Sequence, residues 1–128
     1  MPAQVTNIRV LLLGTEPSAT DIPVGVTTGV SIPVSMALHG IVAFYFTSIG
    51  TTSGGTILIE ESDFTEKTQT YGGTWSQVAS ILASSFTGGA QIAYHISDCA
   101  YGYLRVRISS AITGGGSITA VMRSRGAA

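Results

Sequence analysis

Charged residues are scarce in this chain. Asp, Glu, Lys and Arg make up 10% of its 128 residues, against about 25% in an average soluble domain. Six Lys and Arg and seven Asp and Glu leave a net charge of -1. Because binding to phosphates requires an excess of cations, this balance argues against a nucleic acid partner. A surface with so few charges is poorly suited to remain monomeric, so we expect a subunit of an assembly.

Cysteine is almost absent as well. Cys99 is the only one, which excludes a disulfide within the chain and a structural zinc site built on thiolates. The apolar run that follows Arg9 stops at Gly14, and it is too short for a membrane span or for the core of a signal peptide. We therefore expect no membrane partner and no export signal.

Motifs for catalysis are also lacking. His95, Asp98 and Cys99 are close in sequence, but residues 95 and 99 lie at opposite ends of a strand-to-turn passage, too far apart for a hydrogen bond of about 3 Å. No nucleophile elbow surrounds Cys99, and the glycine clusters lack the Lys and Ser or Thr of a phosphate loop. His39 has no partner at a ligand spacing. We expect neither an enzyme nor a cofactor.

An acidic cluster follows one expected strand and consists of Glu60, Glu61, Asp63 and Glu66. Glu60 points to one side of a strand, whereas Glu61 and Asp63 point to the other. The cluster also lacks the glycine that a calcium loop needs at its tight turn. We expect no metal here, and interpret the cluster as a solvated strand end or as a partner for arginines of this chain or a neighbour.

Short β-type runs separated by Gly, Ser and Thr clusters fill most of the chain. They cover residues 5–13, 32–38, 40–49, 56–62, 91–97, 101–110 and 117–125. Strands at this spacing, without a repeated helical pattern, predict one all-β domain over 1–128, an antiparallel sandwich or barrel. The glycine-rich loop at 50–55 predicts a hairpin between the strands on either side of it.

Two segments allow more than one interpretation. Residues 15–31, with prolines at 17, 23 and nearby 33, predict an extended arm that reaches a partner or a long loop on its own domain. Residues 75–86 place Trp75, Val78, Ala79 and Leu82 at spacings of three and four, which indicates one short helix. The frequent serines and missing helix-forming charges favour a strand instead.

The last third of the chain alternates in two runs, 101–108 and 117–125, on either side of the turn at 113–116. This pattern predicts a β-hairpin. Centring the turn on Gly115 places the apolar residues of both runs on one face, whereas a one-residue slip would bring arginines onto it. The shared apolar face consists of Leu104, Val106, Ile108, Ile118, Ala120 and Met122.

Four arginines then occupy the other face of this expected hairpin. Arg107 would lie opposite Arg123, and Arg105 opposite Arg125. Like charges that face each other are destabilising, so we expect carboxylates to cover them. The candidate interface consists of Arg105, Arg107, Arg123, Arg125, Glu60, Glu61, Asp63, Glu66, Tyr101 and Tyr103.

Aromatic residues offer an alternative type of surface, a platform for a glycan. The candidates are Trp75, Tyr71, Tyr94, Tyr101 and Tyr103. Tyr101 and Tyr103 share a strand face with Arg105 and Arg107, which suits recognition of a glycan or a protein. The other interpretation is ordinary packing in the core and at its edges.

The second half of the chain resembles small β-sandwich virion proteins of tailed bacteriophages, in particular capsid decoration or cement proteins. The similarity lies in Gly72-Gly73-Thr74-Trp75-Ser76-Gln77-Val78, then in Tyr103-Leu104-Arg105-Val106-Arg107-Ile108 after a Gly-rich turn, and in Thr113-Gly114-Gly115-Gly116-Ser117-Ile118-Thr119-Ala120-Val121. The resemblance implies a jelly-roll or related sandwich that forms homo-oligomers. It also implies binding to the major capsid protein on the outer surface of a virion, after synthesis in the host cytoplasm.

A different virion location gives the alternative function. Similar Gly-Thr-Trp and Arg-Val-Arg patterns also occur in tail and fibre modules, and the alternative function is that of a carbohydrate-binding or receptor-binding module of a tail fibre or adhesin. The tyrosines and Trp75 would then form the binding platform.

Overall fold

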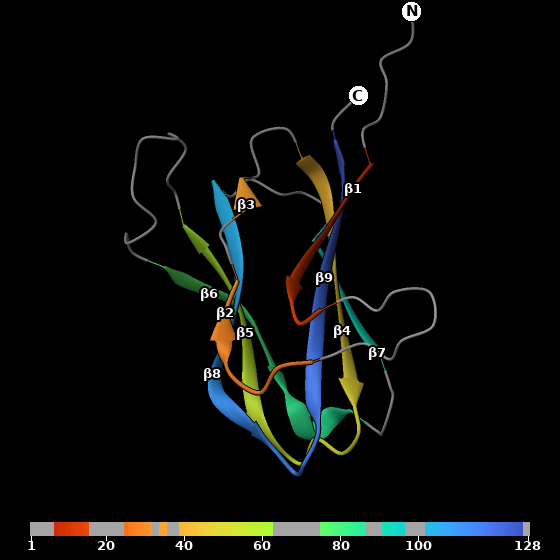
Figure 1. Ribbon diagram of the computed structural model, residues 1–128. Coiled ribbons are helices and arrows are strands. Elements are labelled where there is room, and N and C mark those ends of the chain that lie inside the picture. The colour runs from red at the N-terminus through yellow and green to blue at the C-terminus, as the bar shows by residue number, and fades with distance from the viewer. Residues whose placement is uncertain are drawn as a thin grey trace, which may run out of the picture.

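A computed structural model of the chain describes residues 7–15, 25–31, 34–35, 39–62, 75–86, 91–96 and 102–126. Within these ranges nearly all regular structure is β-strand, and the remaining element is one 3-10 turn at Ala83–Ser85 (Figure 1). The strands are β1 (Asn7–Leu13), β2 (Gly29–Val30), β3 (Val34–Ser35), β4 (His39–Ile49), β5 (Gly54–Ser62), β6 (Ser76–Leu82), β7 (Gln91–Ile96), β8 (Tyr103–Thr113) and β9 (Ser117–Gly126). This part of the chain contains no helix long and apolar enough to cross a membrane.

The strands form two antiparallel sheets that pack face to face (Figure 1). The β9 sheet has the order β1-β9-β4-β7, and the β8 sheet has the order β2-β8-β5-β6 with β3 also paired to β8. If β2 and β3 count as one interrupted strand, every link between consecutive strands crosses between the sheets except the link from β5 to β6. This is the connectivity of a jelly roll, which confirms the predicted β-sandwich and its jelly-roll topology.

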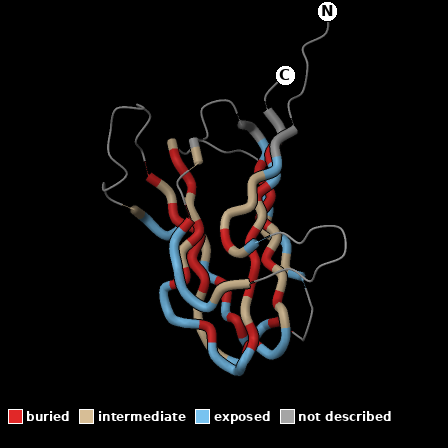
Figure 2. The backbone as a smooth tube through the Cα atoms, viewed as in Figure 1, coloured by how far each residue is buried: buried red, intermediate tan, exposed pale blue. Residues whose placement is uncertain are grey.

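The core lies between the sheets and follows from the alternation of each strand. Phe44 and Phe46 of β4 face Ile57 and Ile59 of β5, and all four are fully buried. Figure 2 shows buried stretches in the strands of both sheets, interspersed with less buried ones. Each Å² of apolar surface removed from water contributes about 25 cal/mol of stabilising free energy. Burial of this shared interior therefore holds the two sheets together.

Both predicted hairpins are wrong, because each connects strands of different sheets. β8 leads through Gly114 and Gly115 into β9 of the other sheet, and β4 leads into β5 in the same way. A connection of this kind, from a strand of one sheet to a strand of the facing sheet, is called an arch. It still directs the apolar faces of its two strands into one core. The alternation of inward and outward side chains in the strands of Leu104 and Ile118 is therefore the same for an arch and for a hairpin. Only the pairing of the strands distinguishes the two arrangements.

The two arches stack on each other at one end of the sandwich. β4 pairs with β9 and β5 pairs with β8, so the turns lie side by side. The Ser53 N–H donates to the Thr113 carbonyl at 2.8 Å, and the Gly116 N–H donates to the Thr51 carbonyl at 2.7 Å. Each arch thus supplies hydrogen-bond partners for the backbone of the other.

The segment 75–86, for which the sequence allowed either a helix or a strand, contains strand β6. β6 pairs with β5 from Thr56↔Leu82 to Glu61↔Ser76, with a register shift between Ile59 and Glu60. Ile81 of β6 is buried in the core while Leu82 next to it is exposed, which is the alternation of a strand. The backbone of β6 gains its hydrogen bonds from β5, and this outweighs a weak helical spacing.

Part of the proline-bearing segment lies on its own domain. Val26 exchanges two backbone hydrogen bonds with Ile118 of β9, at 2.8 and 3.0 Å. Ser31 donates its N–H to the Val106 carbonyl at 2.8 Å and accepts the Val106 N–H on its hydroxyl at 2.9 Å. Residues 25–31 therefore follow the long-loop interpretation, whereas residues 16–24 lie outside the described part of the chain, where the arm stays a prediction.

Candidate functional site

The outer face of the β8 sheet brings together charged residues from two strands. On β8, Arg105 and Arg107 alternate with buried Leu104, Val106 and Ile108, so both arginines point away from the core. On β5, Glu60 lies directly opposite Arg105 in register. Glu60 is thus a direct cross-strand neighbour of Arg105 and a diagonal neighbour of Arg107, and both positions are within reach of long side chains.

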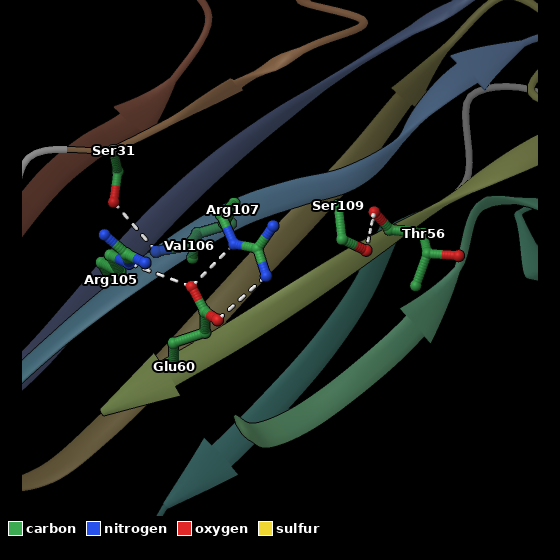
Figure 3. Close-up of polar contacts among 7 residues, drawn as sticks. All are labelled: Ser31, Thr56, Glu60, Arg105, Val106, Arg107 and Ser109. Atoms are coloured by element: carbon green, nitrogen blue, oxygen red, sulfur yellow. Dashed lines mark hydrogen bonds and ion pairs between the residues drawn. The ribbon is translucent and has the colours of Figure 1, made fainter. Parts of the chain in front are cut away.

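Glu60 binds both arginines of its own chain (Figure 3). Arg105 donates through Nε to Glu60 Oε1 at 3.0 Å. Arg107 donates through Nε to Oε1 at 2.9 Å and through Nη2 to Oε2 at 3.2 Å. The contact with Arg107 is therefore a two-pronged pair, the geometry that gives an arginine–carboxylate contact direction as well as strength.

Trp75 adds an aromatic contact at the edge of this site. The guanidinium carbon of Arg105 lies 4.1 Å from the centroid of a Trp75 ring, which is a cation–π contact. Arg105 is thereby held between the indole and Glu60. We call Glu60, Trp75, Arg105 and Arg107 the arginine–glutamate cluster.

Burial within the arginine–glutamate cluster is uneven. The side chain of Glu60 is 7% exposed, that of Arg105 is 19% exposed and that of Arg107 is 38% exposed. The acid is therefore enclosed by its partners while Arg107 faces solvent. One carboxylate between two guanidiniums leaves the cluster with a net charge of one positive unit, and Arg107 is the member that can present it to a partner.

The electrostatics of Glu60 result from two opposing effects. Burial raises its pKa, but hydrogen bonds from Arg107 and Arg105 and the attraction of both guanidiniums lower it by more. The net pKa lies below the ordinary value of 4.5. The hydrogen bond to Glu60 in turn raises the pKa of Arg107, so the Glu60 carboxylate and the Arg107 guanidinium are both charged at neutral pH.

The remaining arginines of the candidate interface lie on the other sheet. Arg123 of β9 is opposite Arg9 of β1 and Ala43 of β4, and Arg125 is opposite Asn7 and Ile41. The prediction that Arg107 faces Arg123 and Arg105 faces Arg125 is wrong, because β8 and β9 form an arch and do not pair. Arg9 was missed by the sequence reasoning, and no local pattern signals a pairing between strands so distant in the chain.

The remaining acids of the candidate interface are only partly described. Glu61 is opposite Leu104 and Ser76 and points to the other side of β5 from Glu60. Asp63, Glu66 and Tyr101 lie outside the described residues. Of the four predicted acids, Glu60 is the one seen to cover arginines.

The candidate tyrosines of the platform are divided between the two sheets and the residues outside the described part of the chain. Tyr103 is buried on β8, and Tyr94 on β7 belongs to the other sheet and packs against the core. Tyr71 lies outside the described residues. The exposed His95 stacks edge-on against Tyr45 with ring centroids 6.3 Å apart, whereas Asp98 and Cys99 lie outside the described residues. Within the described part of the chain, no three His, Cys, Asp or Glu residues are grouped as metal ligands would be.

Comparison with known proteins extends the description of the fold. No protein-family model and no curated protein matches the chain. Its structure is similar to that of the SPBc2 prophage-derived protein YomS, with 10% sequence identity, a TM-score of 0.55 and coverage of 98% of this chain and 97% of that chain. A chain of the disulfide-linked pili of Bacillus endospore appendages matches with 10% identity and a TM-score of 0.45, over 98% of this chain and 88% of that one. The likeness to the prophage-derived protein is therefore a likeness of fold along the whole domain.

Proposed function

We propose that this protein is a structural subunit of a phage virion, without catalytic activity, that binds the capsid surface as a decoration protein. The observation that carries the proposal is the character of its surface. Large apolar side chains are exposed on both sheets, at Val30 (52% exposed), Ile41 (47%) and Leu82 (56%), in a chain with 10% charged residues. A surface with so few charges is poorly suited to an exposed monomer and fits a subunit that partners cover.

The fold also supports the proposed role in a virion. A jelly roll is a common architecture of viral capsid proteins, and the full-length likeness in fold to a prophage-derived protein is compatible with it. A fold hosts many functions, so this support is secondary to the surface.

The outer face of the β8 sheet is the proposed capsid-binding surface. Val30 of β2 pairs with Arg107 of β8, which places an exposed apolar side chain beside the partly exposed guanidinium. Glu60 accepts from Nε and Nη2 of Arg107, and the two N–H groups of Nη1 are further donors that arginine offers. A carboxylate of the major capsid protein would complete this contact, and many such weak contacts on one shell would add up through multivalency.

Co-sedimentation with capsids tests the proposal. Purified protein is mixed with expanded tailed-phage capsids prepared without decoration protein, and the pelleted fraction is measured against concentration. We expect saturable pelleting that is weakened by Arg107→Gln and unchanged by Arg123→Gln, which removes the same charge from the other sheet. Protein that stays in the supernatant at all concentrations while it binds a glycan array would overturn the proposal in favour of a carbohydrate-binding module.

A further inference from the structure

The two sheets end in edge strands, and most of these are protected against pairing with another chain. β1 carries Arg9 and has a register shift between Leu11 and Leu13. β2 and β3 have two residues each, and β6 faces a register shift between Ile59 and Glu60. Charges, bulges and short length are the usual devices that block edge-to-edge association.

β7 has none of these devices. Its six residues, Gln91 to Ile96, include no charged residue, no proline and no glycine. It pairs with β4 in an unbroken register from Val42↔Ile96 to Thr47↔Gln91. Within the described part of the chain β4 is its one neighbour in the sheet, so the other side of β7 presents backbone N–H and C=O groups.

The side chains of β7 are arranged in two rows. Ile92, Tyr94 and Ile96 point inward and are half-buried against the core, while Gln91, Ala93 and His95 are exposed. The core therefore covers the inner row only in part. A further strand here would cover apolar surface and bind the backbone at once.

We propose that β7 pairs with β7 of a second copy of this chain, in antiparallel orientation, and joins two β9 sheets into one continuous sheet. A two-fold contact places a surface against itself, so a charged patch would meet its own sign. The outer face of the β9 sheet carries Arg123, and the outer face of the β8 sheet carries the positive arginine–glutamate cluster. β7 carries no Asp, Glu, Lys or Arg, which makes it compatible with its own copy.

The alternation of β7 fits this symmetry as well. If the two-fold axis passes at Ala93 or at Tyr94, each residue faces one of the same parity, so inward side chains meet inward side chains. Centring on Tyr94 places Ile92 opposite Ile96 of the second copy and Tyr94 opposite its equivalent. The core of each sandwich would then continue across the contact without an unpaired charge.

This inference names the surface for the self-association that belongs to the proposed function, and it is tested without a capsid. Sedimentation equilibrium of the purified chain over a wide concentration range should give a mass near twice the 13.2 kDa of one chain. Ala93→Lys should raise the dissociation constant at least about tenfold, because both registers bring the two new charges close together. Ala111→Lys is the matched control, since Ala111 is an exposed alanine on β8, and it should leave the dimer unchanged.

Hydrogen exchange provides a second measurement that needs no variant. The amides of β7 should exchange more slowly as the protein concentration rises through the dissociation constant, whereas those of β6 should not respond. A strict monomer at millimolar concentration would overturn the proposal. So would a dimer that Ala93→Lys leaves intact, or one without concentration-dependent protection in β7. Failure of capsid binding with an intact β7 dimer would instead refute the decoration role alone.

Discussion

Arg107 contacts both carboxylate oxygens of Glu60 although its direct cross-strand neighbour is Leu58. The residue directly opposite Glu60 is Arg105, which makes a single hydrogen bond through Nε at 3.0 Å and lies against Trp75. The diagonal arginine therefore holds the carboxylate in place, while the opposite one links it to the indole.

The first prediction concerns removal of the shared acid. Glu60→Gln should lower the free energy of unfolding by about 2 kcal/mol, because it replaces charged hydrogen bonds and leaves two neighbouring arginines uncompensated. Chemical denaturation of both proteins measures the change. Glu61→Gln is the control on the other side of β5 and should alter stability by less than about 0.5 kcal/mol; equal losses in the two variants would contradict a specific role for Glu60.

Acidification should reproduce the effect of that substitution. The pKa of Glu60 lies below its ordinary value of 4.5 in the folded protein, so its stabilising contribution is complete above about pH 4.5 and is lost as the pH falls through the lower folded value. Melting temperatures measured from pH 7 to pH 3 should therefore fall more steeply in the parent protein than in Glu60→Gln. Parallel curves would show that Glu60 has the same pKa in the folded and unfolded states.

Trp75 allows the arginine–glutamate cluster to be observed directly. It is the single tryptophan of the chain, and Arg105 covers one of its faces. Arg105→Gln should shift the emission of the folded protein to longer wavelength, since water replaces the guanidinium, and should cost about 0.5–1 kcal/mol. Arg123→Gln should leave the spectrum unchanged, and an equal shift in both variants would exclude the cation–π contact as its source.

The stacked arches predict a contrast between adjacent glycines. A Cβ on Gly116 would lie 2.5 Å from the carbonyl oxygens of Ile49 and Thr51, whereas a Cβ on Gly115, at a φ of +92°, meets nothing within 4 Å. Gly116→Ala should cost about 2–3 kcal/mol through steric conflict, and Gly115→Ala about 1 kcal/mol through backbone strain. Thermal unfolding of the two variants measures the difference, and the reverse order would show that the arches do not pack as described.

Much of the fold follows from local patterns, but its pairings do not. The alternation of β8 predicted that Leu104, Val106 and Ile108 face the core, and they are buried there. It did not predict an arch, because an arch and a hairpin bury the same rows of side chains. The contact of Glu60 with Arg105 joins residues 45 positions apart, so it depended on β5 and β8 being neighbours. Sequence reasoning named the members of this pair as interface candidates and could not assign them to each other.

The place of β9 in its sheet has a consequence for the order of events during synthesis. β9 lies between β1 and β4, and in the described part of the chain β1 has no other neighbour in the sheet. Asn7 pairs with Arg125, so β1 stays without its sheet partner until nearly the whole domain has left the ribosome. Arrested ribosomes carrying chains that end before β9 should therefore expose an apolar N-terminal strand to chaperones, and release of β9 should end that exposure in one step.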